Sequence, residues 1–154
     1  MSSTPEKASA GEEMEPVHYL ATLLKFAVGK NASDIHLRTR AHPIVRIDGA
    51  LKSMDRFPET SPSFMKELTN KIIPQHNLDE FNTRRQSDFS FGLKGIGRVR
   101  ANAYHQRGSI SLALRVINTD VPSPEGLGLP EAVRRFFHEE RGLVLMTGAT
   151  GSGK

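Results

Sequence analysis

The sequence of 154 residues contains no cysteine and no long apolar run. The absence of cysteine excludes disulfides, zinc ribbons and thiol catalysis within this chain. No segment reaches the roughly 20 consecutive apolar residues that a membrane-spanning helix needs. The N-terminal segment Met1–Lys7 also lacks the apolar stretch of a signal peptide. We therefore expect a protein of the cytoplasm.

A strong excess of one charge is also missing. Lysine and arginine together number 21 against 17 acidic residues, which gives a net charge of +4. This mild excess is compatible with nucleic acid, acidic lipid or nucleotide as a partner, but a solvated surface explains it equally well. The chain lacks the interleaved aromatic and basic residues of nucleic-acid binders, so that partner is disfavoured. The six histidines (18, 36, 42, 76, 105 and 138) lack metal-ligand spacing, and no metal site is predicted.

The hydrophobic period changes several times along the chain. Residues 1–14 are small, polar and acidic and are expected to form a disordered tail. Val17, Leu20 and Leu24 then recur at helical spacing before Gly29. The further expected elements are strands over 33–37, 44–47 and 50–54, helices over 62–73 and 75–84, and strands over 88–93, 98–104 and 110–116. Ser61-Pro62 is expected to cap the helix over 62–73.

Short turns indicate how these strands connect. Asp48-Gly49 is a dipeptide that readily adopts the positive φ angles of a tight hairpin turn. Glycine-containing turns near 95–97 and 106–108 join the last three strands into an antiparallel meander. Helices combined with such a meander predict an α+β domain over 15–117. Asp34 and His36 share one strand face, where surface or interface polarity is favoured over acid–base chemistry.

A second domain is expected to begin near residue 131. Residues 118–130 contain three prolines and two glycines, which is the composition of an interdomain linker. A helix with Val133, Phe136 and Phe137 on one face is expected next. The continuous apolar run Leu143–Met146 then predicts a strand buried on both faces of a parallel sheet.

The last seven residues match the phosphate-loop pattern G-x-x-x-x-G-K. They are Gly148, Ala149, Thr150, Gly151, Ser152, Gly153 and Lys154. Glycines at this spacing let successive backbone N–H groups surround a phosphate, and the lysine reaches the β- and γ-phosphates as a point charge. The apolar run that precedes the loop agrees with this interpretation, because the motif follows a strand. We therefore expect the loop to bind ATP, with Lys154 as its catalytic residue.

Several parts of an ATPase site are not among these residues. The motif continues with Ser or Thr, whose hydroxyl holds Mg²⁺, and a later strand supplies an acidic residue to the metal site. Those positions would follow Lys154. We therefore expect the chain to be a fragment that does not hydrolyse ATP by itself.

Upstream motifs resemble those of a known family. The segments that carry the resemblance are 32–37, 43–49, 97–108, 114–117, 126–130 and 141–145. Together they resemble the secretion-type ATPases of type II secretion and type IV pilus systems. Within that family they are most similar to the pilus-retraction ATPases, and second to their accessory paralogue. Ala149 stands where the retraction ATPases usually have proline, and alanine there is similar to the paralogue.

The resemblance implies a two-domain motor. A PAS-like domain over 15–117 would be joined by the linker 118–130 to a RecA-like ATPase domain, of which 131–154 is the start. Such proteins assemble as hexameric rings, use ATP and Mg²⁺, and act at the inner face of the cell membrane on a pilus platform protein. The implied function is type IV pilus retraction. The alternatives are a type II secretion or pilus-assembly ATPase and, from another class, a non-catalytic assembly module.

Arginines of the meander form a second set of candidates. Arg98 and Arg100 share one strand face, Arg107 lies at the following turn, and Arg115 lies on the next strand. The resemblance implies that arginines of this region contact nucleotide phosphates across a domain or subunit junction. Guanidinium geometry suits phosphate oxygens, which can accept two parallel hydrogen bonds. The alternative is that these arginines are simply solvated.

Overall fold

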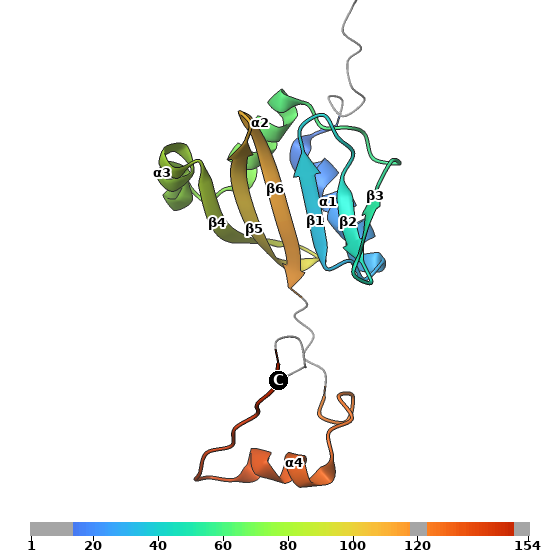
Figure 1. Cartoon of the computed structure of the whole chain (residues 1–154), viewed down its shortest axis with the longest axis vertical. Coiled ribbons are helices and arrows are strands. Elements are labelled where there is room, and N and C mark those ends of the chain that lie inside the picture. The colour runs from blue at the N-terminus through green and yellow to red at the C-terminus, as the bar shows by residue number, and fades with distance from the viewer. Residues whose placement is uncertain (1–13, 118–122, 150–154) are drawn as a thin grey trace, which may run out of the picture. The chain divides into compact units, whose positions relative to one another are not determined.

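The computed structural model describes residues 14–117 and 123–149. They fall into two compact units, Met1–Thr119 and Asp120–Lys154, which are considered separately. The elements of the first unit are α1 (Pro16–Gly29), β1 (Asp34–Arg38), β2 (Ile44–Ile47), β3 (Ala50–Ser53), α2 (Pro62–Ile72), α3 (Gln75–Arg84), β4 (Gln86–Leu93), β5 (Gly97–Gln106) and β6 (Ser109–Ile117) (Figure 1). Each corresponds to a predicted element. The expected tail, except for Met14, and residues 118–122 of the expected linker lie outside the described residues.

All six strands form one antiparallel sheet in the order β3-β2-β1-β6-β5-β4. The predicted hairpin β2–β3 and the predicted meander β4–β5–β6 are both confirmed. Asp48 and Gly49 have φ angles of 51° and 79°, as a tight hairpin turn requires. The pairing of β1 with β6 joins the two groups of strands into a single sheet.

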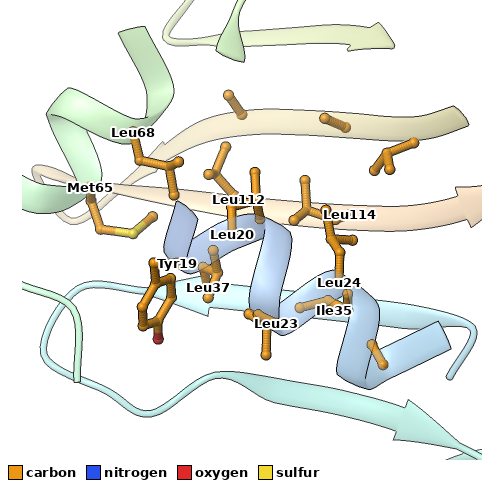
Figure 2. Close-up of a cluster of buried hydrophobic side chains, with 14 of the residues drawn as sticks. Tyr19, Leu20, Leu23, Leu24, Ile35, Leu37, Met65, Leu68, Leu112 and Leu114 are labelled. Carbon is orange, nitrogen blue, oxygen red and sulfur yellow. The ribbon is translucent and has the colours of Figure 1, made fainter. Parts of the chain in front are cut away.

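Helix α1 is the main cover of the apolar face of the sheet. It begins with Glu15, whose carboxylate accepts a hydrogen bond from the His18 backbone N–H at 2.8 Å, followed by Pro16 in the first turn. Leu20, Leu23 and Leu24 are completely buried. Figure 2 shows these leucines gathered with side chains of β1 and β6. The 3.6-residue period of the sequence therefore places the helix against the sheet.

Helix α2 completes this core. Its cap is the predicted one, because the Ser61 hydroxyl accepts a hydrogen bond from the Phe64 backbone N–H at 3.1 Å. Met65 and Leu68 are completely buried beside α1. Tyr19 lies between the two helices and the 57–60 segment, and its hydroxyl donates to the Pro58 carbonyl at 2.9 Å. Burial raises the pKa of this phenol well above its usual value.

The opposite face of the sheet is polar. Along β1 and β5, buried residues alternate with half-buried or exposed ones, as a two-faced antiparallel sheet requires. The buried set includes Ile35, Leu37, Val99, Ala101 and Ala103. Their neighbours along the strands face away from both helices. This polar face holds most of the candidate arginines.

The second unit has little secondary structure among residues 123–149. It contains the short helix α4 (Glu131–Arg135) and a 3₁₀ turn, η1 (Phe136–His138). The predicted helix is therefore present, but Phe136 and Phe137 are 49% and 58% exposed. Leu143–Met146 form no strand and are 55% to 82% exposed. The expectation of a buried strand is wrong for this structure, because residues 123–149 contain no second strand with which it could pair.

Candidate functional site

The phosphate loop lies mostly outside the described residues. Thr150–Lys154 are not described, so the roles of these residues and of Lys154 in particular remain predictions. Gly148 and Ala149 are described and are exposed, without regular secondary structure. The geometry that bears on function is therefore that of the sheet.

Four side chains form a line across four neighbouring strands of the polar face. They are Arg46 on β2, Asp34 on β1, Arg115 on β6 and Arg100 on β5, and we call them the arginine row. Asp34 is opposite both Arg46 and Arg115, and Arg115 is opposite Arg100. Because neighbouring strands lie about 4.8 Å apart, the row brings three guanidinium groups and one carboxylate close together. Ser90 on β4 extends the row by one strand, opposite Arg100.

Asp34 orients two of the three arginines. Its Oδ1 accepts a hydrogen bond from Nε of Arg115 at 2.9 Å and forms an ion pair with a terminal nitrogen of the same guanidinium at 2.8 Å. Its Oδ2 lies 3.3 Å from Nε of Arg46 and accepts a hydrogen bond from the Ser33 hydroxyl at 2.9 Å. Partial burial raises the pKa of this carboxyl, but the Ser33 hydrogen bond and the two arginines outweigh that effect. The net pKa therefore lies below its usual value, and Asp34 is ionised at neutral pH.

Arg100 differs from the other arginines of the row. Its guanidinium has no ion-pair or hydrogen-bond partner among residues 14–117 and 123–149, whereas Arg46 also donates to the Gly49 carbonyl at 2.9 Å. Arg100 lies directly opposite Arg115. Like charges in opposed positions destabilise a sheet, and the Asp34 carboxylate beside Arg115 offsets this repulsion only in part because it is shared with Arg46. The row has three positive charges and one negative charge, and it is therefore suited to a ligand with a negative charge.

Arg98 borders the same region. It lies two residues before Arg100 on the same face of β5, and Nε and a terminal nitrogen donate to the Ser90 hydroxyl at 3.3 and 2.9 Å. A concavity of about 710 Å³ is lined by Arg98 and Arg100, together with Pro74, His76, Asn77, Asp88, Phe89 and Ser90. The acid in this lining, Asp88, accepts a hydrogen bond from the Asn102 amide at 3.0 Å. The structure thus gathers Arg98, Arg100 and Arg115 in one place.

Arg107 lies elsewhere. It follows the last residue of β5 and occupies the turn to β6. Since a strand rises about 3.4 Å per residue, the six residues from Arg100 to Gln106 separate Arg107 from the row by roughly 20 Å. The four predicted arginines therefore do not form a single group.

Sequence reasoning missed Asp34 and Arg46 as members of the row. The sequence predicts only surface or interface polarity for Asp34 and singles out no role for Arg46. The alternation within 34–38 and 44–47 places both on the polar face. The missing information was the pairing of β1 with β6, which puts Asp34 beside Arg115 across 81 residues of chain.

No helix within 14–117 and 123–149 has the length and apolar character needed to cross a membrane. The same residues contain no group of three or more histidine or acidic side chains that could hold a metal ion.

The chain is similar in sequence to several known proteins that are related to one another, although no protein-family model matches it. The chain is 32% identical over 132 residues to the type IV pilus ATPase PilU of Pseudomonas aeruginosa. The matched part covers 86% of this chain and 34% of PilU. It is 34% identical over 135 residues to the pilus retraction ATPase PilT of the same organism, and this match covers 88% of this chain and 39% of PilT. Type II secretion system protein E of Dickeya dadantii is 31% identical over 157 aligned positions, and this match covers 94% of this chain and 31% of that protein.

Solved structures agree with these sequence matches. The crystal structure of the pilus retraction motor PilT with bound ADP has a TM-score of 0.77 and 42% identity, covering 86% of this chain and 38% of that one. The chain spans 34% and 39% of the length of the first two curated relatives. It belongs to the family of secretion-type ATPases of type IV pilus and type II secretion systems.

Proposed function

We propose that the chain is the N-terminal portion of a hexameric motor that hydrolyses ATP and powers type IV pilus retraction. The observation that carries this proposal is the 34% identity to a pilus retraction ATPase over 88% of the chain. The solved motor with 42% identity contains ADP, which supports nucleotide as the ligand. The phosphate-loop pattern at 148–154 supports the same conclusion, since it supplies backbone N–H groups and a lysine to phosphate oxygens.

The proposal assigns a role to each part of the chain. Residues 15–117 form a PAS-like domain, 118–130 a linker, and 131–154 the start of a RecA-like domain. Lys154 contacts the β- and γ-phosphates of ATP, and Mg²⁺ is held by residues that follow it in the whole protein. The motor works in the cytoplasm, at the membrane face that carries the pilus platform protein.

Within this proposal the arginine row contacts the nucleotide phosphates. Arg100 is the principal contact, because its guanidinium is unpaired and is held beside a second positive charge. Arg115 and Arg46 are fixed by Asp34 and supply a preorganised positive field. Arg98, which donates to Ser90, borders the same concavity.

The direct test of the phosphate loop uses the whole parent protein. Lys154→Ala removes the charge that reaches the phosphates and is expected to abolish ATP turnover while leaving the folded sheet intact. Steady-state phosphate release measures the first effect, and circular dichroism measures the second. Arg141→Ala, which also removes one positive charge from the second unit, serves as the matched control and is expected to keep turnover. Wild-type turnover in the Lys154→Ala protein would refute the role of the loop.

A second candidate within the family is a type II secretion ATPase. It is favoured by the match to type II secretion system protein E, which covers 94% of this chain. The two functions are separated by deleting the parent gene in its own organism. Loss of twitching motility with normal protein secretion supports the retraction motor, and the reverse result supports the secretion ATPase.

A further inference from the structure

A second group of arginines lies at the other end of the sheet. Arg38 is the last residue of β1, Arg40 lies in the loop that follows, and Arg107 lies in the turn between β5 and β6. Because β1 pairs with β6, these separate segments meet at one edge of the sheet. They line a concavity of about 390 Å³, and we call the three residues the edge arginines. The rest of its lining is Thr39, Ala41, Gln106, Ser109 and Ser111.

The edge arginines have no counter-charge. None of the three guanidinium groups has an ion-pair or hydrogen-bond partner among residues 14–117 and 123–149. No acidic residue lines the concavity. The neighbouring acid Glu59 has its carboxylate 3.6 Å from Nε2 of His42. Three adjacent positive charges repel one another, and nothing in the described part of the chain offsets that repulsion.

Ser111 adds a hydroxyl to the concavity. The residue is 3% exposed, lines the concavity, and lies opposite Arg38 in the strand register. Its hydroxyl makes no hydrogen bond within the described residues. The oxygen keeps some access to solvent, so the hydroxyl can donate a hydrogen bond to an anion in the concavity.

The backbone around the edge arginines is held in place. The Arg40 backbone N–H donates to the Thr60 carbonyl at 2.7 Å, and the Thr60 hydroxyl donates to the Arg38 carbonyl at 2.8 Å. The Thr39 hydroxyl donates to the Ile110 carbonyl at 3.3 Å, which ties the loop to β6. These bonds hold the backbone from which the Arg38 and Arg40 side chains extend, so the loop does not have to be ordered when a ligand binds.

Two of the edge arginines adopt a backbone conformation that arginine disfavours. The φ angles of Arg40 and Arg107 are 57° and 49°. Arg107-Gly108 forms the same kind of tight turn as Asp48-Gly49, where asparagine, aspartate or glycine is the usual first residue. Arginine gives the turn no conformational advantage, so its presence there is better explained by its charge.

We propose that the edge arginines form an anion-binding site that takes a phosphate group, separate from the arginine row. Guanidinium groups match phosphate oxygens geometrically, and the Ser111 hydroxyl donates one further hydrogen bond. The phosphate is that of a small free phosphate compound or of an acidic phospholipid headgroup, since the chemistry of the two is shared. This inference does not depend on the proposed motor function.

The test uses the 154-residue chain and two probes. Inorganic pyrophosphate is titrated while the backbone amide NMR signals of 39–41 and 107–111 are followed. Sedimentation compares vesicles of phosphatidylcholine with vesicles that also contain phosphatidylglycerol. The main variant is Arg107→Asn, which removes the charge but gives the turn a residue it prefers, so the fold is retained. Arg38→Gln is the second variant.

Arg85→Asn is the matched control. Arg85 is exposed, has a φ angle of 61° and has no partner for its guanidinium within the described residues, but it lies outside the concavity. Whichever of the two probes binds, we expect its affinity to fall about tenfold or more in Arg107→Asn and in Arg38→Gln, because each variant removes a charge-assisted contact. Arg85→Asn is expected to bind like the unaltered chain.

Each outcome has a defined meaning. Pyrophosphate binding with this variant pattern supports a free phosphate compound as the ligand. Sedimentation only with phosphatidylglycerol, in the same pattern, supports a lipid headgroup. Binding that falls equally in Arg85→Asn shows attraction to net charge alone and overturns the proposal. Binding of neither probe overturns it as well.

Discussion

The two faces of the sheet differ in the kind of side chain that they carry. On one face, Leu20, Leu24 and Leu112 are completely buried and contribute to folding through burial of apolar surface. On the other face, Arg46, Arg115 and Arg100 lie in one row with a single carboxylate, Asp34, which pairs with Arg46 and Arg115. Opposed like charges do not stabilise a fold, so the polar face carries a feature that folding alone does not require. The same strands therefore contribute apolar packing to the fold on one face and present charged groups suited to an anion on the other.

The largest effect is expected on the apolar face. Leu24→Ala empties space that a fully buried side chain fills, and it should lower the free energy of unfolding by about 2–5 kcal/mol. Urea denaturation of the 154-residue chain, followed by circular dichroism, measures the change. The matched control is Leu51→Ala on β3, where the leucine is 56% exposed and the loss should be below about 0.5 kcal/mol. Equal losses at both positions would contradict the division between the faces.

A smaller effect is expected at Asp34. Asp34→Asn breaks the ion pairs with Arg46 and Arg115 and should cost about 1 kcal/mol near neutral pH, because the pairs are partly exposed. The pKa of Asp34 is lowered in the folded state, so its contribution is present above the usual aspartate value of about 3.9. That contribution is lost as the pH falls through the lowered pKa.

The difference in stability between the two proteins should therefore shrink in acid. Denaturation curves collected at several pH values measure it. Asp88→Asn is the control, since Asp88 lies on the same face and, within the described residues, its carboxylate accepts a side-chain hydrogen bond from Asn102 alone. A difference between Asp34→Asn and the unaltered chain that stays constant with pH would show that the carboxylate charge is not the source of the stability.

Much of the fold can be predicted from the sequence because its determinants are local. The helical spacing of Leu20 and Leu24, the Ser61 cap and the Asp48-Gly49 turn each act within a few residues. All are confirmed. The pairing of β1 with β6 is not local, since Asp34 and Arg115 are 81 residues apart in the chain. No periodicity encodes that pairing, and the arginine row depends on it.

The absence of non-local information in the sequence pattern also explains the predictions that failed or changed. Leu143–Met146 carry the apolar pattern of a buried strand, but a strand also needs neighbours, and residues 123–149 offer none. Arg107 lies close to Arg98 and Arg100 in sequence, and the family resemblance assigns all three to one set of phosphate contacts. A strand separates its two ends by its full length, so Arg107 lies with Arg38 and Arg40.

The smallest effect on stability is expected at Arg100. Its guanidinium has no partner within the described residues and lies opposite Arg115, so Arg100→Gln should leave the free energy of unfolding within about 0.5 kcal/mol of the original value or raise it slightly. Urea denaturation measures this as well. A large loss would mean that Arg100 has a structural role, and the contrast between the faces would then be weaker.

We propose that the polar face acts on nucleotide phosphates in the whole motor. The most direct measurement is steady-state ATP turnover of the full-length parent protein carrying Arg100→Gln, beside a matched Arg85→Gln control. We expect Arg100→Gln to lower turnover by about 10²-fold or more, as loss of a charge-stabilising donor does in other active sites. Arg85→Gln should retain turnover. Unchanged turnover in the folded Arg100→Gln protein would contradict the account.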